Sequence, residues 1–199
     1  MTTDANLTAA RESFSGKSMT DTQLREAVAI ADIIHGEILR SGSFIEKVTD
    51  YAHAFARNER FDAMRGEKAI RDIHSAVQGQ SMNQTRESLR AAEEALPDHA
   101  VPRALACAEG IERSIQDGPT MPFYQAYDQA AVTFASEFGI TQNTAKTLMK
   151  DSFAEHHGKD LYQHGKNIEQ AYHKPVREAE IAARKAEKLQ TQSHSRSYG

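Results

Sequence analysis

Histidine and carboxylate side chains are the residues of this sequence best suited to chemistry, because together they can bind metal ions or transfer protons. Two of the nine histidines stand in Asp-x-x-His pairs, Asp32 with His35 and Asp50 with His53, a spacing that puts both groups on one face of a helix. Helical metal sites combine such pairs with further carboxylates. Three carboxylates are available for that role: Glu37, Glu46 and Glu67. We interpret these histidines instead as partly exposed side chains that are hydrogen-bonded to their own helix.

A second group of such residues lies near the C-terminal end of the chain: Glu155, His156, His157, Asp160 and His164. It falls where one helix should end and the next begin, and histidine at a helix C-terminus can bind the last backbone carbonyls. The sequence therefore predicts no metal and no cofactor. A metal-binding helical-bundle enzyme is the less favoured of two alternative functions for this chain.

Nucleophilic catalysis has no motif in this sequence. The single cysteine, Cys107, lies in LACAEGI on the apolar face of a predicted helix, where a thiol is usually an inert core residue. A Gly-rich phosphate loop, G-x-S-x-G and H-E-x-x-H are all absent from the sequence. We therefore expect a protein that is not an enzyme.

Composition narrows the class of protein further. The 199 residues are 39% hydrophobic and 26% charged, which excludes wholesale disorder. No apolar run approaches the roughly 18–20 residues of a membrane span, and the N-terminus lacks the pattern of a secretory signal. We expect a cytoplasmic protein without membrane contact. The net charge of −4 does not indicate a globally basic nucleic-acid binder.

The hydrophobic periodicity predicts an all-α protein, a compact multi-helix bundle of about eight helices. Three capping boxes mark helix starts, with the pairs Thr20/Gln23, Ser43/Glu46 and Ser81/Gln84. Residues 1–19 are polar and small and should be mobile. Residues 20–173 should form the helical domain. Residues 174–199 should form a protruding basic helix, kinked at Pro175, and a disordered tail from Gln190 onward.

Residues 131–150, AVTFASEFGITQNTAKTLMK, resemble the helix-turn-helix segment of DNA-binding proteins. The small Ala135 would let two helices cross closely, and Gly139 would permit the positive φ of the tight turn. The apolar positions that would lock the pair are Phe138, Ile140, Ala145 and Leu148. The resemblance implies that five side chains would face DNA: Thr141, Gln142, Asn143, Lys146 and Lys150. The alternative for this segment is a plain structural hairpin.

The C-terminal arm resembles the basic, hydrophilic tails of proteins handled by conjugative or type IV secretion machinery. From Lys174 to the end, six basic side chains accompany three acidic ones. The residues that would form a partner-binding tail are Arg177, Arg184, Lys185, Lys188 and Arg196. In composition, the whole chain is similar to small accessory proteins of conjugative plasmids.

These observations predict a macromolecule-binding protein. The leading hypothesis is a DNA-associated accessory protein that uses the 131–150 hairpin, with duplex DNA as its partner. The alternative is a protein-interaction adaptor, or a secretion or conjugation substrate, read through its tail. A homo-oligomer is compatible with each hypothesis, because the Ala-rich end helix has little apolar surface of its own to bury.

Overall fold

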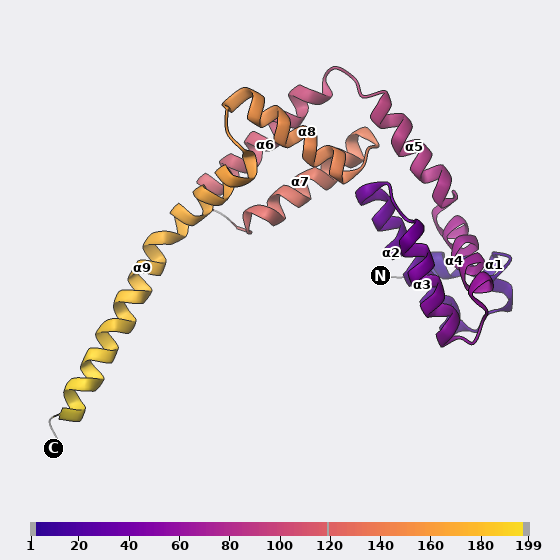
Figure 1. Ribbon diagram of the computed structural model, residues 1–199, viewed down its shortest axis with the longest axis horizontal. Coiled ribbons are helices and arrows are strands. Elements are labelled where there is room, and N and C mark those ends of the chain that lie inside the picture. The colour runs from indigo at the N-terminus through magenta and orange to yellow at the C-terminus, as the bar shows by residue number, and fades with distance from the viewer. Residues whose placement is uncertain (1–2, 119, 197–199) are drawn as a thin grey trace. The chain divides into compact units, whose positions relative to one another are not determined.

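The computed structural model describes residues 3–118 and 120–196, and it describes the side chains among them except those of residue 176, residue 180 and residues 185–196. Nine α-helices and one short 3-10 helix account for most of these residues, and no strand occurs among them, which confirms the all-α prediction (Figure 1). In chain order the elements are α1 (Asp4–Glu12), η1 (Gly16–Ser18), α2 (Asp21–Ser41), α3 (Ile45–Asn58), α4 (Ala63–Gln78), α5 (Met82–Glu94), α6 (Ala100–Gln116), α7 (Phe123–Phe138), α8 (Gln142–His157) and α9 (Leu161–Arg196).

The chain divides into two compact units, and two helices are shared between them. The first unit comprises Met1–Ala100 and Ala131–Ala145, and the second comprises Val101–Ala130 and Lys146–Gly199. The division falls within α7 and within α8, so the end of α7, the turn and the start of α8 belong to the first unit.

The core of the first unit lies between α2, α3 and α4. Five apolar residues of α2 that the sequence places on one stripe are all buried: Leu24, Val28, Ala31, Ile34 and Ile38. Helices α3 and α4 approach closely at Gly66, where an added Cβ would lie 2.8 Å from the Ala52 carbonyl oxygen and 2.8 Å from the Ala56 Cβ. A small residue is therefore required at this crossing.

Two of the three predicted capping boxes are present, at Thr20/Gln23 and at Ser81/Gln84. The predicted box at Ser43/Glu46 is wrong, because α3 begins one residue later with Phe44 as its N-cap and no side-chain cap. The Phe44 carbonyl accepts the first helical bond from the Val48 N–H at 2.8 Å, and the Phe44 ring is only 2% exposed. Burial of the ring thus sets the start of this helix.

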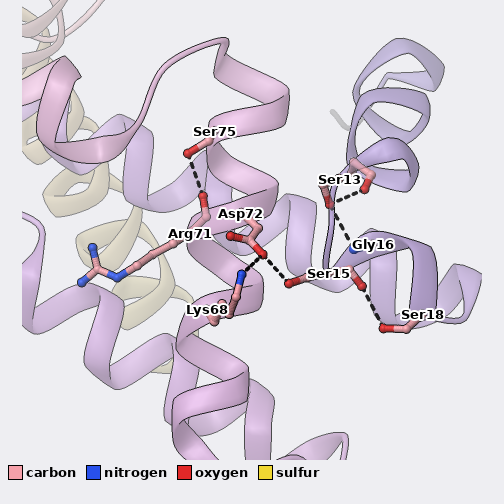
Figure 2. A network of polar contacts seen from close by, with 9 residues as sticks. Ser13, Ser15, Gly16, Ser18, Lys68, Arg71, Asp72 and Ser75 are labelled. Carbon is pink, nitrogen blue, oxygen red and sulfur yellow. Dashed lines mark hydrogen bonds and ion pairs between the residues drawn. The ribbon is translucent and has the colours of Figure 1, made fainter.

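Residues 3–19, for which the sequence predicts mobility, form α1 and η1 and pack against α2 and α4 of the first unit. Helix α1 buries Ala10 completely, and Met19 is 7% exposed. The Asp72 carboxylate on α4 accepts hydrogen bonds from the Ser15 hydroxyl and the Lys68 ammonium, each at 2.6 Å (Figure 2). A few anchoring contacts therefore order a segment whose polar composition suggested none, and α1 is the helix that the predicted eight lacked.

The second unit packs α6, the first part of α7, most of α8 and the start of α9 around buried aromatic and aliphatic side chains. Phe123, Phe153 and Leu161 are each at most 1% exposed. An added Cβ at Gly165 would lie 2.1 Å from the Phe123 ring, so α9 can pass this ring only with glycine there. The Glu169 carboxylate, also on α9, accepts a hydrogen bond from the Phe123 N–H at 3.2 Å.

Helix α9 is a single helix from Leu161 to Arg196 that passes through Pro175 without interruption. The helix continues past Gln190, where the sequence predicts disorder, as far as Arg196. Gln, Ser and Thr are only moderately poorer helix formers than Ala, and a helix that has already nucleated extends at little cost. The predicted tail residues 197–199 lie outside the described residues.

Candidate functional site

The turn between α7 and α8 has the geometry that the sequence predicts. Gly139 has a φ of 67° in the left-handed region, and the Ile140 N–H donates to the Ala135 carbonyl at 3.0 Å, the six-to-one bond of a Schellman motif. Ala135, Ile140 and Ala145 are 5%, 2% and 0% exposed. The segment is therefore a tight helical hairpin locked by apolar contacts.

A carboxylate from α5 closes the N-terminus of α8. Glu93 Oε1 accepts hydrogen bonds from the Thr141 N–H at 3.1 Å and from the hydroxyls of Thr141 and Thr144 at 2.7 Å and 2.6 Å. Burial raises the pKa of Glu93, but the hydrogen bonds from Thr144 and Thr141 outweigh it and leave that pKa below its usual value. Glu93 thus occupies the position at a helix N-terminus where a phosphate would bind.

The five residues proposed to face DNA differ in their exposure to solvent. Thr141 is 6% exposed and caps α8, so it does not face solvent. Gln142 is half-buried beside an apolar groove of about 360 Å³ in the first unit. Asn143 is exposed at the start of α8.

The two lysines of the hairpin lie next to aspartates of the second unit. Lys146 Nζ lies 2.6 Å from Asp128 Oδ1, and Lys150 Nζ lies 3.8 Å from Asp160 Oδ2. The Tyr127 hydroxyl donates to the Lys146 carbonyl at 2.7 Å. Its burial, together with the carboxylates of Asp160, Asp128 and Asp151, raises the pKa of Tyr127 to about 12. This side of α8 therefore has an acidic environment.

The predicted partner-binding tail lies on α9. Arg177 and Arg184 are exposed, whereas the side chains of Lys185, Lys188 and Arg196 lie outside the described side chains. Lys174 pairs with Glu178 across one helical turn at 3.9 Å. The described basic side chains of this segment thus reach solvent.

The Asp-x-x-His pairs do not assemble a metal site. His35 Nδ1 lies 3.3 Å from His74 Nε2 on α4. The partner of His35 is therefore on another helix, whereas the sequence predicts a partner on its own helix. His53 is exposed on α3. Two of the three carboxylates proposed as further ligands form ion pairs, since Glu37 binds Arg40 and Glu67 binds Arg71.

The structure brings together a histidine and carboxylate cluster that the sequence reasoning found only in part. His157 Nε2 lies 3.1 Å from Glu109 Oε1, and His164 Nε2 lies 2.8 Å from Glu112 Oε1, so α6 supplies a carboxylate to each of two histidines. The Phe153 ring lies 4.5 Å from the ring of His157 and 5.9 Å from that of His164, measured between centroids. The one sequence signal for this partnership is the spacing of the two glutamates, three residues apart on one helix face.

Comparison with known proteins gives no match: no family model, curated protein or solved structure is similar to this chain. Within residues 3–118 and 120–196, no helix combines the length and the apolar character needed to cross a bilayer.

Proposed function

We propose that this chain is a protein-interaction module that binds an acidic protein partner through the outer α9 segment, residues 171–196. The observation that carries the proposal is the exposure of this segment. From Ala171 to Arg184, every side chain that the structure describes is exposed except that of His173, which is half-buried. The exposed side chains that the structure describes in this segment are therefore available to a partner.

Such a helix gains little from its own unit. Isolated helices are marginally stable in water, and Pro175 removes one backbone hydrogen bond within this one. A partner that buries one face of the segment would supply the missing stabilisation. This expectation favours a binding role over a purely structural one.

Charge indicates the chemistry of the partner. Among the side chains of the segment that the structure describes, the two large apolar ones that are exposed, Tyr172 at 50% and Ile181 at 54%, are nine residues apart and so lie on opposite sides of the helix. These two side chains therefore do not lie on one apolar stripe. From Lys174 to the end, six basic side chains accompany three acidic ones, so charge complementarity favours a partner with an acidic surface.

Site-specific photo-crosslinking tests this proposal. A crosslinker placed at Ile181 should capture a discrete partner from native cell extract, and deletion of residues 176–199 should abolish co-purification of that partner while the circular dichroism of the remaining core is retained. The matched control is the same crosslinker at Met64 on α4, which is 82% exposed. Capture of the same partner from Met64, or undiminished co-purification after the deletion, would contradict the proposal.

The DNA-binding hypothesis makes a separate prediction. The first unit carries 12 basic and 17 acidic side chains, and both lysines of the hairpin are paired with aspartates, so we expect no duplex binding at physiological salt. A gel-shift assay over a salt series decides this. A salt-sensitive shift that weakens in the Lys146→Ala, Lys150→Ala double variant would establish the hairpin as a phosphate-binding surface instead.

A further inference from the structure

We propose that Glu109, His156 and His157 form a binding site for a divalent transition metal ion, with Zn²⁺ as the best fit. One ligand atom from each of the three side chains lies within 4.8 Å of the other two. The ligands come from α6 and from the end of α8, and all three residues belong to the second unit. The proposal is independent of the protein-interaction role of α9.

The separation of two of the ligands already matches that of a zinc site. In a tetrahedral site with bonds of about 2.1 Å, two ligand atoms lie roughly 3.4 Å apart. His157 Nε2 and Glu109 Oε1 lie 3.1 Å apart, so an ion bound between them would require only a small adjustment. The His157 ring is also held in place, because it packs against the buried Phe153 ring with the centroids 4.5 Å apart and the planes tilted by 40°.

The third ligand depends on the way α8 ends. The side chains of successive residues on a helix point about 100° apart and do not normally bind the same metal ion. His156 and His157 are the last two residues of α8, and Gly158 follows with a φ of 64°. Their ring centroids lie 4.7 Å apart with the planes nearly perpendicular. A modest rotation of the exposed His156 ring would therefore complete the site.

The donor set determines the preferred ion. Two imidazole nitrogens and one carboxylate oxygen suit Zn²⁺ and other borderline transition metals, whereas Mg²⁺ and Ca²⁺ prefer oxygen ligands alone. Three protein ligands leave one position of a tetrahedral ion for water or an external group. His156 also lines a groove of about 330 Å³ with Val101, Pro102 and Leu105, so a small ligand can reach this side of the cluster.

Calorimetric titration of the full chain with ZnCl₂, after removal of metals with a chelator, tests the proposal. We expect saturable binding of one Zn²⁺ per chain and none of Mg²⁺. Removing a side chain that only hydrogen-bonds to a metal ligand already lowers metal affinity about tenfold. Removing a ligand itself, in His156→Ala or Glu109→Gln, should therefore weaken Zn²⁺ binding by about tenfold or more. X-ray absorption at the zinc edge of the loaded chain should show imidazole nitrogen among the ligands.

The decisive variant is His156→Ala, because this side chain is exposed and its removal leaves the core unchanged. His53→Ala is the matched control, since His53 is exposed on α3 in the first unit. Unchanged affinity in His156→Ala, an equal loss in His53→Ala, or the absence of saturable binding by the wild-type chain would overturn the proposal.

Discussion

Acid should destabilise the first unit through His74, the one fully buried histidine that the structure describes. His74 is 0% exposed, its Nδ1 has no hydrogen-bond partner, and its Nε2 faces His35 Nδ1 at 3.3 Å. Burial, with a smaller contribution from the neighbouring His35, lowers the pKa of His74 from 6.5 to about 4. A proton on this ring would therefore place a charge in a fully buried site, and the backbone hydrogen bond to Gln80, which raises the pKa, offsets only part of that cost.

The sign and size of the effect follow from this difference. Between pH 6.5 and about pH 4 the unfolded chain binds more protons than the folded one, so stability is lost as the pH falls through this range. Linkage between these two pKa values gives a loss of ~2 kcal/mol in the free energy of unfolding between pH 7 and pH 5. The pKa of His35 is also lowered, mainly by burial, which acts in the same direction.

Urea unfolding at pH 7, 6 and 5, followed by circular dichroism, measures this loss. The His74→Met variant removes the titrating ring while keeping an apolar side chain of similar size, so its pH dependence should be flatter than that of the wild type by ~2 kcal/mol over the same range. His53→Ala controls for an exposed histidine. An identical pH dependence in His74→Met and the wild type would refute the reasoning.

Two further substitutions test the packing of each unit. Gly165→Ala should lower stability by about 1–3 kcal/mol in a thermal melt, because the new Cβ would overlap the buried Phe123 ring. Gly110→Ala is its control and should be neutral or slightly stabilising, because an added Cβ there meets nothing within 4 Å. An equal loss of stability in both variants would show that the overlap with Phe123 is not the cause. Glu93→Ala should cost about 1–3 kcal/mol and speed amide exchange at the start of α8, since it removes the acceptor of three hydrogen bonds. Glu94→Ala, which removes the exposed partner of Arg90, is its control. Similar amide exchange in the two variants would show that Glu93 does not stabilise the start of α8.

The helices were predictable because their signals are local. Thr20 and Gln23 are three residues apart, and the structure forms the box that their spacing predicts. The same spacing at Ser43 and Glu46 was misleading, because burial of Phe44 decides where α3 starts. Local pattern therefore identifies an element well and fixes its first residue less well.

The candidate metal site was predictable only in part, because its ligands come from distant parts of the sequence. His156 and His157 stood out as neighbours, but Glu109 is separated from His157 by 48 positions along the chain. Nothing in the periodicity of α6 indicates which helix it will face. The order of helices in space, which a single sequence does not specify, decides such pairings.

The sharing of α7 and α8 between the two units has a consequence for synthesis on the ribosome. The first unit needs Ala131–Ala145, and the second needs chain from Lys146 onward. Residues 1–100 therefore emerge before the buried Phe134, Ile140 and Ala145 that complete their packing. When only residues 1–100 have left the exit tunnel, the nascent chain would expose apolar surface that the finished protein covers, so chaperone capture should peak at that stage and decline once residue 145 has also emerged.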